Sequence, residues 1–395
     1  MLRRSLAFLS AAALAIASFA QTPAYKPHYL FVWAGDAAQQ HTDFLAVIDA
    51  VPDSPHYGQL LTTLDTDQKT GYVHHTEYVM PAGGTLFAND HDAGRTFLFE
   101  LRDPLHPRIA GSFTDIDGYT HPHSFLRLPN QHVLSTFQRG HDGGGLVELD
   151  QDGHYLRSAS AADPTHPGVF YSPYSVVLLP EMDRALSTNS SMNVHERSGS
   201  TYQVWRLSDL KLLSTNYFQP SSQLTGHTDP EEPRRAPDGS VFVQTYSCGL
   251  EHVTGIATEH PKADFVYQFP GGACGVPTIV GHYLVQSVPL IHGIVALDIA
   301  NPGKPVEVSR VSFPGDYTAH WTAWDAVTSR IVVTPGPEGV HRVYLVRFDQ
   351  ATGKLAVDDS FRDLEDHQPG FSFDNRSWPQ GWTGSAAPHG AVFSR

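Results

Sequence analysis

The chain has 395 residues and a formal net charge of −15, with 41% hydrophobic and 17% charged residues. This composition excludes a disordered or fibrous protein, and the acidic balance argues against nucleic acid as a partner because little basic surface remains to neutralise phosphates. The 33 glycines and 29 prolines favour turns and short strands over helices, and the 23 histidines are the first sign of chemistry.

Residues 1–20 have the pattern of a secretory signal peptide. Arg3-Arg4 precedes an apolar run over 6–17, and Ser18-Phe19-Ala20 ends it in the small residues that suit cleavage. The run is too short to cross a bilayer, and no later segment reaches about 18 continuous apolar residues. We expect an exported protein, periplasmic or secreted, without a membrane span. Export by the Sec or by the twin-arginine route is left open.

Short strand patterns recur roughly every 50 residues over 21–395. In one copy, the runs 122–128, 132–137, 145–149 and 155–159 are alternating or β-branched and are bounded by Gly, Pro, Asn or Asp. Units of four antiparallel strands repeated around an axis are typical of a β-propeller. The first strands of successive units are expected to begin near His75, His123, Tyr174, Asp229, Val276, His320 and His389.

Seven first strands predict seven blades, one of which is supplied by both ends of the chain. The runs 29–33, 44–49 and 59–64 have the character of second, third and fourth strands, while 388–393 has that of a first strand. Their pairing would close the ring and leave no open sheet edge. We therefore expect an all-β fold in one domain, 21–395: a seven-bladed β-propeller closed by pairing of N- and C-terminal strands in one blade.

Cys248 and Cys274 are the only cysteines. Cys248 falls in the predicted loop between strands two and three of blade four, and Cys274 lies just ahead of the first strand of blade five, on the same face. In an oxidising compartment such a pair is expected to form one disulfide. Two cysteines alone cannot hold a Cys₄ zinc ion or an iron–sulfur cluster.

Histidines occupy equivalent positions in several predicted first strands, which line the axis of a propeller. His75, His123, His320 and His389 are such residues, and His74 adjoins His75. Neutral imidazole suits copper, zinc, iron and nickel, so these five histidines predict a transition-metal site. A plain polar lining that only holds water is the alternative. Other histidines near the same face are His91, His121, His141, His195, His227 and His292.

Three glutamates accompany these histidines: Glu77, Glu231 and Glu232. Each is a candidate ligand, a residue that orients an imidazole, or a general base. Glu77 and Glu231 are the predicted catalytic residues. The sequence has no Gly-x-Ser-x-Gly, Walker or dinucleotide glycine motif, so a serine hydrolase or a nucleotide-binding enzyme is not favoured.

Several stretches resemble one known family: 44–49 with 52–59, His74-His75-Thr76, Thr120-His121-Pro122-His123, 291–293 with 297–299 and 301–302, and Pro388-His389-Gly390. On these stretches the chain resembles the selenium-binding protein family, whose bacterial members include methanethiol oxidase. The resemblance implies a seven-bladed propeller, copper held by His74, His75, His123 and His389, and oxidation of methanethiol to formaldehyde, sulfide and peroxide. His320 is added from the repeat. Residues 80–84 stand where the family has its Cys-x-x-Cys, so selenium binding through that thiol is not expected.

Two functions follow as hypotheses. The first is a copper-dependent oxidase of a small thiol, with another transition metal left open. The second is a non-catalytic binding module that uses its axial face for a small ligand or a partner protein. A metal-dependent hydrolase or lactonase would need oxygen ligands, and Glu77, Asn193, Asp229 and Glu231 are too scattered to favour it. The oligomeric state is left open.

Overall fold

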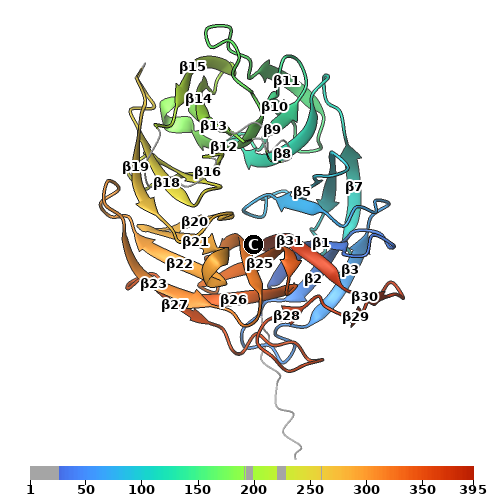
Figure 1. The fold of residues 1–395 in the computed structure, drawn as a ribbon. Coiled ribbons are helices and arrows are strands. Elements are labelled where there is room, and N and C mark those ends of the chain that lie inside the picture. The colour runs from blue at the N-terminus through green and yellow to red at the C-terminus, as the bar shows by residue number, and fades with distance from the viewer. Residues whose placement is uncertain (1–25, 191, 193–198, 220–227, 259) are drawn as a thin grey trace, which may run out of the picture.

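A computed structural model describes residues 26–190, 192, 199–219, 228–258 and 260–395. Within them the chain forms strands and two 3-10 helices, η1 (Pro180–Met182) and η2 (Pro289–Ile291), and no α-helix. Seven units of four antiparallel strands surround one axis (Figure 1), so the predicted all-β, seven-bladed propeller is confirmed. No helix in the described part of the chain has the length and hydropathy needed to span a bilayer. The predicted signal peptide, 1–20, lies outside the described residues.

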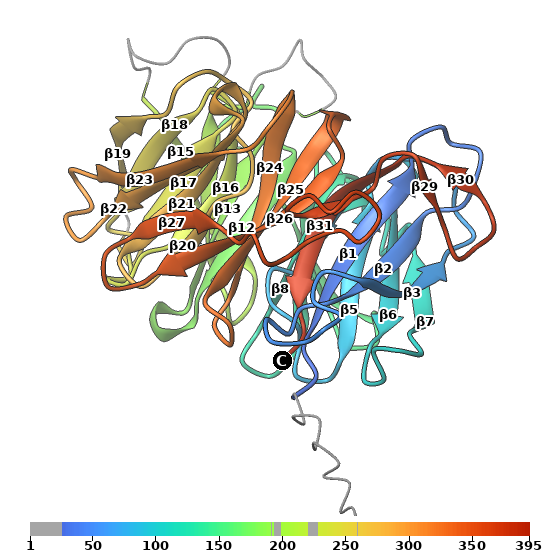
Figure 2. The same ribbon diagram turned by 90° about the horizontal axis from the view of Figure 1, so that it is seen from below.

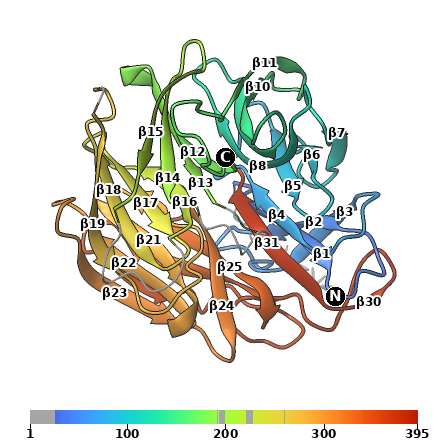
Figure 3. The same cartoon turned by 45° about the horizontal axis from the view of Figure 1, so that its top comes forward.

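Each blade runs from a first strand at the axis to a fourth strand at the rim (Figure 3). Blades one to three consist of β4 (Val73–Thr76), β5 (Thr85–Asp90), β6 (Arg95–Glu100) and β7 (Arg108–Phe113); β8 (Thr120–Arg127), β9 (Val133–Arg139), β10 (Gly145–Leu149) and β11 (Tyr155–Ser160); and β12 (Pro173–Leu179), β13 (Arg184–Asn189), β14 (Thr201–Arg206) and β15 (Lys211–Tyr217). Blades four to six consist of β16 (Pro230–Arg235), β17 (Val241–Thr245), β18 (Gly249–Thr254) and β19 (Lys262–Gln268); β20 (Thr278–Val280), β21 (Tyr283–Val288), β22 (Gly293–Asp298) and β23 (Val306–Ser312); and β24 (Tyr317–Asp325), β25 (Arg330–Gly339), β26 (Arg342–Asp349) and β27 (Lys354–Val357).

Blade seven joins the two ends of the chain. Its strands are β31 (Ala386–Phe393), β1 (Tyr29–Asp36), β2 (Phe44–Asp49) and β3 (Leu60–Asp65), and β31 pairs antiparallel with β1. Figure 2 shows the C-terminal strand beside the N-terminal ones. All eight residues of β31 are buried, and Trp321 Nε1 of blade six donates a hydrogen bond to Ala391 O at 2.8 Å. The ring is therefore closed by the predicted pairing.

A segment between β27 and β31, which the sequence did not predict as structured, covers blade seven. It contains β28 (Phe371–Ser372), which pairs with β26, and the hairpin β29 (Arg376–Ser377) and β30 (Thr383–Gly384). Its Trp378 packs on Phe44 of β2 with ring centroids 4.7 Å apart. The segment thus adds aromatic cover over the blade that closes the ring.

The hydrophobic core lies between neighbouring blades. Second and third strands are buried along most of their length, whereas fourth strands such as β7 are largely exposed. Strands covered on both faces need apolar residues at consecutive positions, as in Phe44–Asp49. Trp33 of blade seven, for example, packs edge-on against Phe97 and Phe99 of blade one, with centroids 5.8 and 5.3 Å away.

Six side-chain hydrogen bonds near the axis tie the seven blades together in succession. In each case a polar side chain of a second strand donates a hydrogen bond to a backbone carbonyl of the next blade, which lies in the first strand or just before it. These bonds hold the first strands in register with one another. They run from Asn89 to Pro122, Thr136 to Tyr174, Thr188 to Glu231, Gln244 to Cys274, Ser287 to His320 and Thr334 to His389.

Candidate metal centre

The first strands of six blades share an irregularity in their pairing with the second strand. In five of these blades two residues of the first strand lie opposite one residue of the second, and in blade six one extra residue is inserted. Such β-bulges release residues from the regular alternation of faces and are common beside functional sites. The residues in these bulges are His74 with His75, His123 with Ser124, Tyr174 with Ser175, Glu231 with Glu232, His320, and His389 with Gly390.

The bulges bring five imidazoles from four blades together. The ring centroids of His74 and His75 lie 4.1 Å apart, those of His74 and His389 4.3 Å, those of His75 and His123 4.4 Å, and those of His320 and His389 4.6 Å. In a regular strand His74 and His75 would point to opposite faces, but in the bulge of β4 both belong to the cluster. All five histidines predicted as ligands therefore meet at the axis.

The nitrogens of these rings form two sets that share one residue. Candidate ligand atoms of His74, His75 and His123 lie within 4.8 Å of one another, and so do those of His75, His320 and His389. Each set is compact enough for three imidazoles to reach a shared ion by small rotations of the rings. Of the five residues, only His320 is partly exposed; the others are buried.

Unpaired nitrogens show that the cluster suits a cation. Leaving a buried polar atom without a hydrogen bond costs about 1–3 kcal/mol. Among the described residues, six ring nitrogens of the cluster have no such partner: Nδ1 of His74, both nitrogens of His75, Nε2 of His320 and both nitrogens of His389.

Burial keeps these imidazoles neutral. Desolvation, and then the repulsion that a second protonated imidazole nearby would cause, hold the pKa values of His74, His75 and His389 well below the ordinary value of 6.5. Burial lowers the pKa of His320 to about 4. Since the neutral ring is the form that binds a transition metal, the donor set fits copper and its neighbours.

The glutamates lie in different surroundings. Glu77 is bonded to Arg127, whose Nε donates to Oε1 at 2.7 Å, and no hydrogen bond or ion pair described for Glu77 reaches the cluster. Burial raises the pKa of Glu77, and the Arg127 guanidinium opposes this.

The Glu231 carboxylate accepts a hydrogen bond from Gln244 at 3.2 Å, and burial raises the pKa of Glu231 well above the usual value. Glu232 is the acid that faces the imidazoles, with Oε1 3.8 Å from His75 Nδ1. The catalytic roles of Glu77 and Glu231 stay predictions.

The other histidines divide between the edge of the cluster and the surface. His91 is buried, with its ring 5.4 Å from that of His74, and its Nε2 bonds to Gln138. The ring of His121 lies beyond that of His91, with the two ring centroids 6.4 Å apart. His141 is exposed and bonds to the carbonyl of Asp117, and the Nδ1 of His292 lies 3.0 Å from the carbonyl of Tyr317. Asn193, His195 and His227 lie outside the described residues.

Aromatic residues that the sequence analysis did not select enclose the cluster. The Tyr174 ring lies 3.9 Å from that of His123, and the Trp321 ring lies 5.0 Å from that of His75. Tyr78 stacks on Trp321 at 5.0 Å. The position of Tyr174 in its blade is equivalent to that of His123, so the same repeat that identified the histidines also marks it.

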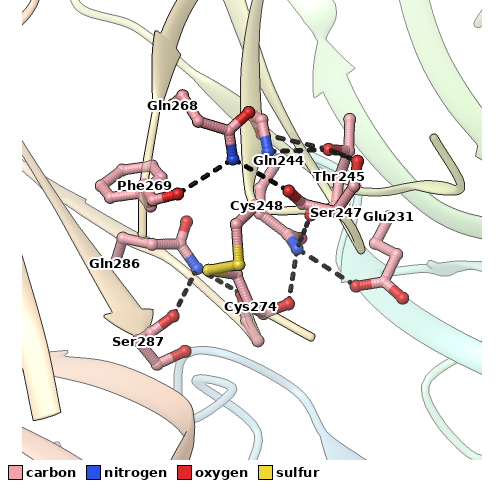
Figure 4. The surroundings of a disulfide bond; sticks show 12 residues. Glu231, Gln244, Thr245, Ser247, Cys248, Gln268, Phe269, Cys274, Gln286 and Ser287 are labelled. Atoms are coloured by element: carbon pink, nitrogen blue, oxygen red, sulfur yellow. Dashed lines mark hydrogen bonds between the residues drawn. A yellow bond between two sulfur atoms is a disulfide. The ribbon is translucent and has the colours of Figure 1, made fainter. Parts of the chain in front are cut away.

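The predicted disulfide is present between Cys248 and Cys274, whose Cα atoms are 5.0 Å apart. Figure 4 shows that Gln244 connects this bond to the bulge of blade four. Gln244 Nε2 donates to Cys274 O at 2.6 Å and to the Glu231 carboxylate at 3.2 Å. The disulfide therefore joins blades four and five beside the axis.

Comparison with known proteins finds a relative in sequence and matches in fold. No family model matches it. A methanethiol oxidase from Hyphomicrobium sp. is 26% identical over 208 residues, which are 47% of this chain and 47% of that protein. The chain thus spans about half the length of the curated relative that it matches.

Two solved structures have the same fold. A hypothetical selenium-binding protein from Sulfolobus tokodaii matches with a TM-score of 0.74 and 15% identity over 94% of each chain. The periplasmic gluconolactonase of Pseudomonas aeruginosa matches with a TM-score of 0.62 and 13% identity, over 94% of this chain and 99% of that one. Structures at these identities show the fold alone. The predicted resemblance is therefore confirmed: the chain is similar in sequence to a methanethiol oxidase and has the fold of a selenium-binding protein.

Proposed function

We propose that the protein is an exported, copper-dependent oxidase of a small thiol. The observation that carries the proposal is the meeting of five imidazoles with six buried nitrogens that have no hydrogen-bond partner among the described residues. When bound, copper supplies a centre that changes oxidation state beside a coordinated sulfur. The residues that would hold it are His74, His75, His123, His320 and His389.

Access to the site is assigned to the side of His320. It is the one partly exposed residue of the five, so this is the side on which a small substrate would approach the cluster. Tyr174 and Trp321 cover the rings of His123 and His75 and exclude water from them. Sulfur also makes favourable contacts with aromatic rings, which suits a thiol.

Methanethiol is the first substrate to test. The name of the sequence relative supports this choice, and because the match covers about half of each chain, the substrate belongs to the proposal. In the overall reaction, one methanethiol, one dioxygen and one water yield formaldehyde, hydrogen sulfide and hydrogen peroxide, so carbon, sulfur and oxygen balance. The carbon is oxidised and dioxygen is reduced.

Export is part of the same proposal. The disulfide between Cys248 and Cys274 is typical of a protein that matures in an oxidising compartment. Together with the predicted leader at 1–20, it supports a periplasmic or secreted location. Detection of the mature chain in the periplasmic or secreted fraction would test this part alone.

The experiment is metal analysis combined with turnover. Protein purified from the periplasm is loaded with copper, freed of excess ion and examined for bound copper, for consumption of methanethiol and for peroxide release. We expect stoichiometric copper and copper-dependent consumption of the thiol. Protein that retains no copper would overturn the proposal. Bound copper without thiol turnover would leave the binding module as the better description of the axial face.

A further inference from the structure

Glu232 is a fully buried carboxylate whose two oxygens have different surroundings. Oε2 accepts hydrogen bonds from Tyr78 at 2.8 Å, from Ser175 at 3.0 Å and from Arg234 at 2.8 Å. Oε1 has no hydrogen-bond partner among the described residues and lies 3.8 Å from Nδ1 of His75, which also has none. The carboxylate is therefore held at one oxygen and left free at the other, toward an imidazole of the cluster.

We infer that Glu232 is a positioning residue for the metal centre, acting on His75 directly and on His123 through two serines. The inference rests on the proposed function, since it concerns how these imidazoles would present nitrogen to copper. A metal-binding histidine commonly donates its second N–H to a carboxylate, which fixes the ring and leaves the other nitrogen for the ion. Glu232 would accept from His75 Nδ1 and leave Nε2 as the ligand atom.

The path to His123 follows from the direction of the hydrogen bonds. Ser175 donates to Glu232 Oε2, and Ser124 donates to Ser175 at 3.1 Å. Because the Ser124 hydroxyl hydrogen is used in this way, its oxygen is an acceptor for His123 Nδ1, 3.3 Å away. His123 then carries its hydrogen on Nδ1, and its Nε2, which lies 3.0 Å from His74 Nε2, has a lone pair that could bind an ion. One carboxylate thus selects the same tautomer in two histidines from different blades.

The surroundings of Glu232 offset the cost of burying its charge. Arg234 forms an ion pair with Oε2, and its guanidinium lies 4.1 Å from the centre of the Tyr78 ring. A buried carboxylate that lacked such partners would be strongly destabilising. Glu231, its neighbour in the same bulge, bonds to Gln244 instead. Of the two adjacent acids, only Glu232 is built into the support of the imidazoles.

The test measures copper binding rather than turnover. Glu232→Gln keeps the shape of the side chain but replaces one of the two accepting carboxylate oxygens with an NH2 group, which cannot accept a hydrogen bond. We expect copper affinity, measured by competition with a chromophoric chelator, to fall about 10- to 100-fold, and the nitrogen hyperfine pattern in the electron paramagnetic resonance spectrum to change. Glu251→Gln is the matched control. Glu251 is a buried acid of the same blade that interacts electrostatically with Asp264 and has no described contact with the histidine cluster, so this variant should bind copper as the wild type does.

Ser175→Ala provides a second variant that keeps the carboxylate. It breaks the path to His123 and removes one of the three hydrogen bonds to Glu232 Oε2, so we expect a smaller loss of affinity with a changed spectrum. Wild-type affinity and spectrum in Glu232→Gln, or in Ser175→Ala if Glu232→Gln does not fold, would overturn the inference while the proposed function stands. Wild-type protein that binds no copper would overturn both.

Discussion

Nε2 of His74 lies 3.0 Å from Nε2 of His123, although the two residues are 49 positions apart and belong to different blades. Only one hydrogen fits between two nitrogens at this distance, so at least one of them presents a lone pair to the other. The same arrangement allows both lone pairs to turn toward one ion. The contact thus shows in two residues how the propeller joins distant imidazoles at one point.

Removing one member of this pair tests the metal site. For His123→Ala we expect copper affinity to fall at least about 100-fold, or roughly 2.7 kcal/mol, because the ion loses a ligand from a buried set. His141→Ala is the control, since that ring is exposed and bonds to the carbonyl of Asp117. Equal copper retention in the two variants would mean that the buried histidines are a polar lining.

The sequence was sufficient to predict the architecture because strand patterns are local. First, second and third strands lie at or within a few residues of the predicted positions, as with β10 (Gly145–Leu149) and the closing strand β31 (Ala386–Phe393). Equivalent positions in successive repeats then placed His75, His123, His320 and His389 at one axis. The covering segment with Trp378 has no counterpart in the other repeats, so the four-strand repeat does not predict that it is structured.

The orientation of neighbouring side chains could not be predicted. Alternation in a regular strand allows only one of Glu231 and Glu232 to face the axis, and it does not show which. The bulge in β16 breaks the alternation between Pro230 and Pro233. A bulge depends on pairing with the second strand and on the hydrogen bond that Thr188 donates from the preceding blade. These contacts are tertiary, so the sequence alone does not distinguish Glu232 from Glu231 as the acid that faces the imidazoles.

Gly390 tests how closely the closing strand must approach blade one. A Cβ at this position would lie 2.5 Å from Thr76 N and 2.8 Å from His74 O. Gly390→Ala should therefore lower the free energy of unfolding by about 1–3 kcal/mol and weaken copper binding, because β4 and its two histidines must move. Gly111→Ala, in a strand with open space around the new methyl group, should change neither. Chemical denaturation and chelator competition measure the two effects, and wild-type behaviour of Gly390→Ala would refute this account of the contact.

The disulfide should contribute to stability independently of the metal. Cys248 and Cys274 are 26 residues apart in sequence, and releasing a loop of this size typically lowers the free energy of unfolding by about 2–4 kcal/mol. We expect this loss in the double variant Cys248→Ala/Cys274→Ala, measured by denaturant unfolding. Adding a reductant should destabilise the wild type but leave the double variant unchanged. A variant as stable as the oxidised wild type would contradict the prediction.

A buried pair of acids predicts how stability depends on pH. Asp43 and Asp90 both contact the Thr70 hydroxyl. Burial, reinforced by the charge of Asp43, raises the pKa of Asp90 to about 7. The folded protein therefore holds this proton more tightly than the unfolded chain does. The resulting stabilisation is complete below pH 3.8, declines as the pH rises from there to about 7, and is absent above that range.

Asp90→Asn removes this ionisation and isolates its effect. Relative to the variant, wild-type protein should lose a few kcal/mol of unfolding free energy between pH 4 and pH 7, since each unit of pKa shift corresponds to about 1.4 kcal/mol. Melting temperatures of the two proteins across this range give the comparison. Asp92→Asn, an exposed acid in the adjoining turn, should follow the wild type. Curves for wild type and Asp90→Asn that stay parallel from pH 4 to pH 8 would show that the pair does not hold a proton, because a raised pKa in the folded state must appear as a slope.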